Sequence, residues 1–209
     1  MKQRLDRGPD RDHMALMLIE TERTPNPATR KFLPGRTVME TGGRDFPNAD
    51  AAEASPLAAA IFATGLVDGV YFGRDFVSVS AKREADWEED YLEPEVLGLL
   101  LDHFTLGAPL FAQGSAAGIE IAPEAPMFED DPADADIVDQ IKELIETRVR
   151  PAVAQDGGDI VYRGYRQGTL YLGMQGACQG CPSSAITLKR GIEGLIKHYV
   201  PEVEAIEAV

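Results

Sequence analysis

Cysteine is scarce in this sequence, and the few cysteines lie close together. Among 209 residues there are two, Cys178 and Cys181. Cysteines separated by only two residues cannot join distant parts of a secreted fold, so a disulfide framework is excluded. We therefore expect a protein that works in a reducing compartment.

Basic residues are also in short supply. The chain has 20 Lys and Arg against 35 Asp and Glu, which gives a formal net charge of −15. This excess of negative charge disfavours nonspecific binding to nucleic acid or to anionic lipid, because like charges repel. No uninterrupted apolar run approaches the roughly 18 to 20 residues that span a bilayer. We expect a soluble globular protein with neither nucleic acid nor a membrane among its partners.

The first residues lack the apolar stretch that defines a secretory signal. They contain Asp6, Asp10 and Asp12, whereas mitochondrial presequences are poor in acidic residues. We therefore predict that residues 1–13 form a disordered tail, and that a cytoplasmic location is favoured over the mitochondrial matrix.

A single long segment separates two parts of the chain. Between Thr105 and Asp136 there is no Lys or Arg, and the segment contains four prolines and many acidic residues. Such a composition cannot bury enough apolar surface to offset the entropy of ordering the chain. We predict a flexible acidic linker at 107–135, joining a first domain at 14–106 to a second at 136–209.

The first domain has the pattern of an α+β fold. Strands are predicted at 15–20 and 36–40, and a hairpin is predicted from 70–72 and 76–80 because apolar and polar residues alternate there. Ser55 followed by Pro56 is typical of a helix start, and a second helix is predicted from Pro94 to Phe104.

The second domain is predicted to be a smaller α+β unit. Apolar residues recur at helical spacing over 137–149, and Pro151 should end or kink that helix. Strands at 160–162 and 169–172 form a hairpin, a helix covers 183–199, and a last strand covers 203–209. The predicted order is α-β-β-α-β.

The two cysteines lie in a glycine-containing loop between a strand and a helix. Gly176 and Gly180 can adopt positive φ, and Pro182 suits the first position of the helix that follows. The partial positive charge at a helix N-terminus stabilises thiolates. We therefore expect the loop to favour the charged form of sulfur.

Two thiolates cannot complete a tetrahedral metal site or hold a four-iron cluster, which takes four protein sulfurs. The histidines, His13, His103 and His198, are far from the loop in sequence. A two-fold homodimer that places two cysteine pairs face to face would supply four sulfurs. The spacing thus favours an iron–sulfur cluster bridging two chains. Two alternatives stay open: a dithiol oxidoreductase with Cys178 as the attacking thiolate, and a zinc ion clasping a dimer.

Longer motifs carry a family resemblance. In the second domain they are RPAVAQDGGD (150–159), GACQGCPSSAITLK (176–189) and PEV (201–203); in the first they are TPNP (24–27), KFLPG (31–35), DFP (45–47), SPLA (55–58) and VYFGRDF (70–76). Over about residues 14 to 209 the chain resembles the Nfu-type iron–sulfur cluster carriers, in which an Nfu amino-terminal domain precedes the carboxy-terminal module of NifU.

This resemblance implies a scaffold or carrier, not an enzyme. It implies that Cys178 and Cys181 bind a [4Fe–4S] cluster shared between two protomers, which the protein receives from an upstream scaffold and passes to apo-proteins. It leaves open whether a [2Fe–2S] cluster is also carried. The first domain is expected to recognise client proteins, and a bacterial cytoplasm is the expected location.

Overall fold

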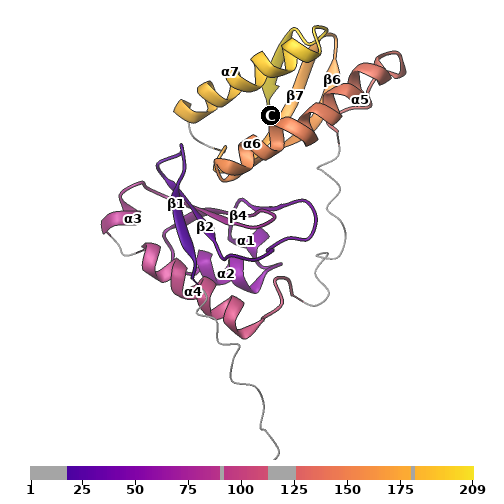
Figure 1. Ribbon diagram of the computed structural model, residues 1–209. Coiled ribbons are helices and arrows are strands. Elements are labelled where there is room, and N and C mark those ends of the chain that lie inside the picture. The colour runs from indigo at the N-terminus through magenta and orange to yellow at the C-terminus, as the bar shows by residue number, and fades with distance from the viewer. Residues whose placement is uncertain (1–17, 90–91, 113–125, 180–181) are drawn as a thin grey trace, which may run out of the picture.

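The computed structural model describes residues 18–89, 92–112, 126–179 and 182–209. They form two α+β domains, one following the other along the chain (Figure 1). The predicted tail at 1–13 and Cys181 lie outside the described residues. No helix in the described ranges is long and apolar enough to cross a membrane.

The first domain is built on a five-stranded antiparallel sheet in the order β1-β2-β5-β4-β3 (Figure 1). Its strands are β1 Glu20–Arg23, β2 Thr29–Leu33, β3 Arg44–Phe46, β4 Val67–Phe72 and β5 Val77–Ala81. Its helices are α1 Ala49–Ala52, α2 Pro56–Phe62, α3 Asp86–Glu89 and α4 Leu92–Leu106.

Two of the predicted elements of this domain depend on strong local signals, and both are confirmed. The Ser55 hydroxyl accepts a hydrogen bond from the Ala58 amide, which caps α2, and Pro56 is the first residue of that helix. Strands β4 and β5 pair as the predicted hairpin.

The strand predicted at 36–40 is wrong. Gly35 has φ +68°, which turns the chain, and the amides of Val38 and Met39 both donate to the carbonyl of Arg74 instead of joining a ladder. The second strand of the sheet is instead β2, Thr29–Leu33. Its sequence TRKFL has no alternation of polar and apolar residues, and four of its five residues are buried. A strand covered on both faces lacks the alternating pattern on which sequence reasoning depends.

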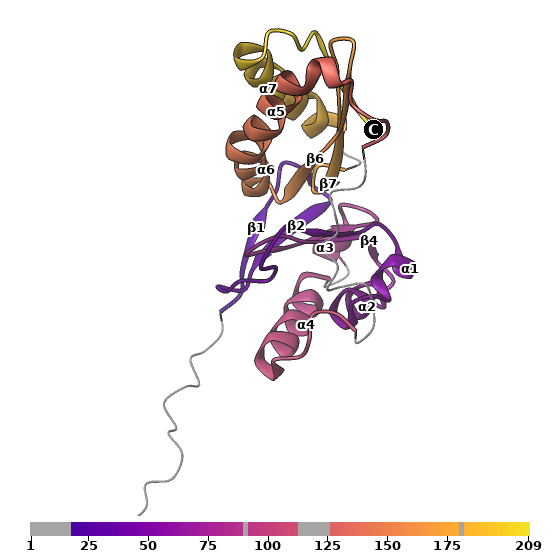
Figure 2. The ribbon, with the colours of Figure 1, turned by 90° about the vertical axis from the view of Figure 1, so that its right-hand side faces the viewer.

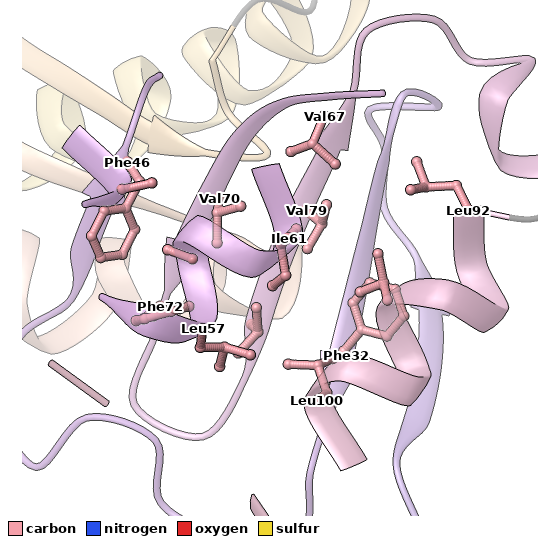
Figure 3. Packing of buried hydrophobic residues seen from close by; sticks show 14 of the residues in the cluster. Phe32, Phe46, Leu57, Ile61, Val67, Val70, Phe72, Val79, Leu92 and Leu100 are labelled. Carbon is pink, nitrogen blue, oxygen red and sulfur yellow. The ribbon is translucent and has the colours of Figure 1, made fainter. Parts of the chain in front are cut away.

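The core of the first domain lies between the sheet and helices α2 and α4 (Figure 3). Phe32, Leu57 and Leu100 are among its fully or almost fully buried side chains. Trp87 is 4% exposed, and its indole N–H donates to the Ala28 carbonyl at 2.7 Å. The ring therefore anchors the segment before α4 to the core, with its polar N–H paired.

Replacing Gly98 with alanine is expected to stabilise the first domain. Gly98 lies in the interior of α4, is exposed, and has no heavy atom within 4 Å of the position a Cβ would take. Alanine is favoured over glycine in a helix by about 0.5–1 kcal/mol. A thermal melt of the full chain should show a higher Tm, whereas Gly35→Ala, which forces alanine to φ +68°, should lower it. An unchanged or lower Tm for Gly98→Ala would contradict this account.

The second domain is confirmed as α-β-β-α-β. The order of elements is α5 Ala135–Leu144, a π turn Ile145–Val149, α6 Arg150–Gln155, β6 Gly158–Arg166, β7 Thr169–Gly176, α7 Pro182–Tyr199 and β8 Ala205–Ala208, with a short 3₁₀ turn Pro132–Asp134 before α5. Strand β7 pairs antiparallel with β6 and parallel with β8. Helices α5, α6 and α7 lie on one side of this sheet (Figure 2).

Pro151 does not end the first helix of this domain. The helix passes through the π turn Ile145–Val149 and continues as α6 to Gln155. Proline has no amide hydrogen and collides with the carbonyl four residues earlier in a regular α-helix. The wider π turn directly before it accommodates the proline without stopping the helix.

The segment predicted as a linker has apolar flanks that pack on the domains. On one side, the Leu110 carbonyl accepts a hydrogen bond from Ser55 Oγ at 2.6 Å. On the other, the Phe128 ring lies 5.3 Å from the Tyr171 ring, measured between centroids. The ordered domains therefore extend into the predicted linker, and residues 113–125 lie outside the described ranges.

Candidate metal centre

Cys178 lies in the loop between β7 and α7. Strand β7 ends at Gly176, whose φ of +61° confirms the prediction that this glycine turns the chain. Helix α7 begins at Pro182, also as predicted. The structure thus places the first of the two predicted ligands, while Gly180 and Cys181 are outside the described residues.

The Cys178 side chain packs against the start of β6. A Cβ added at Gly158 would lie 2.4 Å from the Cys178 sulfur and 2.8 Å from the Gln175 carbonyl oxygen. The two adjacent glycines therefore have different roles. Gly157, with φ +79°, forms the turn before β6, and Gly158 leaves the space that the thiol occupies.

Gly158→Ala is expected to destabilise the second domain by about 1–3 kcal/mol, because its methyl group would overlap the sulfur and the backbone. Urea denaturation of the full chain measures the loss. Gly173→Ala is the matched control in the neighbouring strand: its Cβ would meet the flexible Arg163 side chain at 3.4 Å and the Val161 Cβ at 3.8 Å, an ordinary van der Waals contact. Equal stability of the two variants would show that Gly158 has no special packing role.

Burial raises the pKa of the Cys178 thiol to about 12, and the negative charges of Asp156 and Asp159 add to that effect. The residue is 5% exposed. At neutral pH the group is therefore a protonated thiol, so the expectation of a charged sulfur is wrong for this conformation. The field of a helix end falls off within its first turn, and here it is outweighed by desolvation and two carboxylates. A metal that binds Cys178 must displace its proton.

The two described histidines lie away from the thiol loop. His103 lies in α4 of the first domain, and His198 lies near the far end of α7, with its ring 4.9 Å from Tyr199. His13 is outside the described residues. Across the described ranges, no group of three or more His, Cys, Asp or Glu side chains could hold a metal ion. A metal at Cys178 would therefore need ligands from residues outside the described ranges, such as Cys181, or from another chain.

A buried ion pair lies beside the thiol. Arg150 donates through Nε to one oxygen of Asp159 at 2.8 Å and through its terminal nitrogen to the other at 2.7 Å. Asp159 is 6% exposed and also accepts a hydrogen bond from the Tyr71 hydroxyl at 2.9 Å. Sequence reasoning placed Arg150 and Asp159 in one motif without giving them a role. Tyr71 belongs to a separate motif of the first domain, VYFGRDF (70–76), so its contact with Asp159 could not be found from the sequence.

The chain is thus a two-domain α+β protein whose second domain carries a thiol-bearing loop. Residues 19–107 match the family model described as "Scaffold protein Nfu/NifU N terminal", and residues 141–207 match the NifU-like domain. The chain belongs to the Nfu family of iron–sulfur cluster scaffold proteins.

Two relatives illustrate the likeness. "NifU-like protein 4, mitochondrial" of Arabidopsis thaliana is 47% identical over 193 residues, which is 91% of this chain and 65% of the relative. "NFU1 iron-sulfur cluster scaffold homolog, mitochondrial" of Homo sapiens is 44% identical over 194 residues, or 92% of this chain and 72% of the relative. A solution structure of a NifU-like protein from Saccharomyces cerevisiae is 22% identical and covers 54% of this chain and 99% of its own, with a TM-score of 0.43.

The expected location in a bacterial cytoplasm is wrong, since both of these relatives are named as mitochondrial proteins. That expectation rested on the composition of residues 1–13. A chain that spans 65% of a relative's length gives no basis for inferring location from its first residues.

Proposed function

We propose that this chain carries a [4Fe–4S] cluster held by Cys178 and Cys181 of one protomer and by the same pair of a second protomer. It receives the cluster from an upstream scaffold and passes it to apo-proteins without catalysing a reaction of its own. The observation that supports this most directly is the place of Cys178 in the loop before α7, where no group of three or more His, Cys, Asp or Glu side chains in the described ranges could hold a metal ion.

Ligand number supports sharing between chains. A four-iron cluster takes four protein sulfurs, and each chain has two cysteines. Two-fold symmetry brings identical loops together, so one closed dimer supplies four sulfurs with no further residue.

The environment of Cys178 suits a ligand that must be given up. During transfer a client thiolate replaces a Cys178 thiolate on iron, and the released sulfur takes up a proton as it returns to its buried position. Burial and the neighbouring carboxylates raise the pKa of the Cys178 thiol, so protonation favours release.

The same observations disfavour the oxidoreductase alternative. An attacking cysteine needs an exposed thiolate, whereas Cys178 is 5% exposed and its pKa is raised to about 12. The zinc alternative uses the same ligands and is decided by experiment.

Anaerobic reconstitution of the full chain with ferrous iron and sulfide tests the proposal. Absorption and Mössbauer spectra, iron and sulfide counts, and the mass by size exclusion are measured together. Four iron and four sulfide per dimer, with a monomeric apo chain, is the expected result. A two-iron spectrum would assign a [2Fe–2S] cargo in place of the four-iron one. A colourless chain that binds one zinc or forms a disulfide would overturn the proposal.

A further inference from the structure

A row of polar side chains crosses the outer face of the first domain's sheet. The strand register pairs Lys31 with Ser78, Ser78 with Tyr71, and Tyr71 with Asp45. Directly paired residues point to the same face of a sheet, so these four side chains share one face. We call these four residues, one from each of β2, β5, β4 and β3, the polar row.

Three of the four residues of the polar row are buried although they face away from the core, and Asp45 is half-buried. Ser78 is 1% exposed, Tyr71 2% and Lys31 7%, while their strand neighbours Phe32 and Val77 point into the core. The outer face of an antiparallel sheet packed on one side normally meets solvent. Here the second domain covers it, with the ends of β6 and β7 directed at the sheet (Figures 1 and 2).

Three residues of the polar row bind the turn that precedes β6 and the first residues of β6 itself. Ser78 Oγ donates to the Gly157 carbonyl at 2.6 Å, and Lys31 Nζ donates to the Gln155 carbonyl at 3.2 Å. The Tyr71 hydroxyl donates to the Asp159 carboxylate at 2.9 Å. Two of these three acceptors are backbone carbonyls, one at the end of α6 and one in the turn that follows it.

The first domain also holds the loop that carries Cys178. Asp45 accepts hydrogen bonds from the Gly176 amide at 3.3 Å and from the Gln179 side chain at 3.2 Å. Asn26, in the turn before β2, donates to the carbonyls of Ala177 at 3.2 Å and Gln179 at 3.3 Å. The loop is thus bound on both sides of the thiol.

Two glycines permit this close approach. A Cβ at Gly157 would lie 2.8 Å from Ser78 Oγ, and one at Gly176 would lie 3.0 Å from the Tyr71 ring. Both glycines have positive φ, which serves their turns as well. A side chain at either position would push the second domain off the polar row.

We propose that the polar row is a docking surface for the thiol loop of its own chain, and that it keeps the apo chain closed until a cluster is loaded. Two loops that share a cluster must face one another. In the closed chain the thiol loop is instead hydrogen-bonded to Asp45 and Asn26 of the first domain. Loading therefore competes with intramolecular docking. This last step rests on the proposed function; the closed apo chain does not.

Hydrogen exchange in the full-length apo protein tests the docking. The Gly176 amide is the reporter, because it is bonded to Asp45 across the domains. Ser78→Glu places a carboxylate against the Gly157 carbonyl and close to Asp159, so it should open the chain. We expect exchange at Gly176 to rise at least about tenfold, since a buried charge without a partner is strongly disfavoured. Small-angle scattering should show a larger radius of gyration.

Ser80→Glu is the matched control. Ser80 lies two residues further along β5 on the same face, and its hydroxyl is bonded to Thr29 within the first domain. It should leave exchange at Gly176 as in the wild type. Tyr71→Phe removes one hydroxyl from the docking surface and keeps the ring, and we expect about a fivefold rise. If circular dichroism shows that Ser78→Glu unfolds the first domain, Tyr71→Phe becomes the test of the docking.

Exchange at Gly176 that is the same in the wild type, Ser78→Glu and Tyr71→Phe would overturn the docking. Reconstitution kinetics provide the second readout: Ser78→Glu should load iron and sulfide several-fold faster, to the same final content. Faster exchange without faster loading would overturn the inference that docking of the thiol loop slows cluster loading. If the wild type binds no cluster while exchange still responds, the proposed function fails and the closed chain stands.

Discussion

Replacing Arg150 with methionine is expected to lower the free energy of unfolding of the second domain by about 3 kcal/mol. Asp159 is 6% exposed, and Arg150 contacts both of its carboxylate oxygens. Removing the guanidinium leaves a buried negative charge with only the Tyr71 hydroxyl and a backbone amide to stabilise it. Breaking a buried pair in this way costs about 3–5 kcal/mol, and the 28% exposure of the Arg150 side chain places the loss at the lower end.

Urea denaturation of the full chain measures this loss. Two further variants separate the effect of the buried ion pair from the effect of removing an arginine side chain. Arg148→Met removes the same side chain two residues earlier, where the guanidinium lies over the exposed Tyr199 ring, and should cost less than about 1 kcal/mol. Adding Asp159→Asn to Arg150→Met removes the unpaired charge and should restore part of the stability. If Arg150→Met and Arg148→Met lost the same amount, the buried pair would not stabilise the domain.

Cys178→Ser is expected to reduce the iron and sulfide content after reconstitution by more than about tenfold. A serine at this position removes one of the two sulfurs of each chain, and hence half of the ligands of a cluster shared by two chains. Serine is close in size to cysteine, so the packing against Gly158 is kept and the chain should remain folded. Cys181→Ala is expected to give the same loss of cluster.

The control for this experiment lies between the two cysteines. Gln179→Ala removes side-chain hydrogen bonds to Asp45 and to the Met174 carbonyl but no sulfur, so it should keep the cluster content. Circular dichroism of each apo variant checks the fold. A cluster yield in Cys178→Ser or Cys181→Ala equal to that of the wild type would show that the pair does not hold the cluster.

Features set by neighbouring residues could be read from the sequence. The cap of α2 depends on Ser55 and Pro56, which are adjacent, and the β4–β5 hairpin depends on alternation within a few residues. The loop of Cys178 was recognisable for the same reason, because glycine permits positive φ and proline fixes φ, and both effects are local. Family membership was also recognisable, since its motifs are short runs of consecutive residues.

Features set by residues far apart could not be read in this way. Strand β2 was missed because Arg30 and Lys31 are charged, and only the second domain and Trp87, which lies near Arg30, explain why they are buried. The charge state of Cys178 was mispredicted because the helix start is visible in sequence, whereas the burial of the thiol is not.

The sequence by itself determined the order of elements in the second domain, the position of the thiol loop and the membership in the Nfu family. Tertiary structure alone decided that Cys178 is buried and protonated, that Asp159 is paired with Arg150 and Tyr71, and that the polar row meets the thiol loop. The physical reason is range: caps, turns and alternation act over a few bonds, whereas desolvation and contacts between domains depend on residues up to 153 positions apart, as between Asn26 and Gln179.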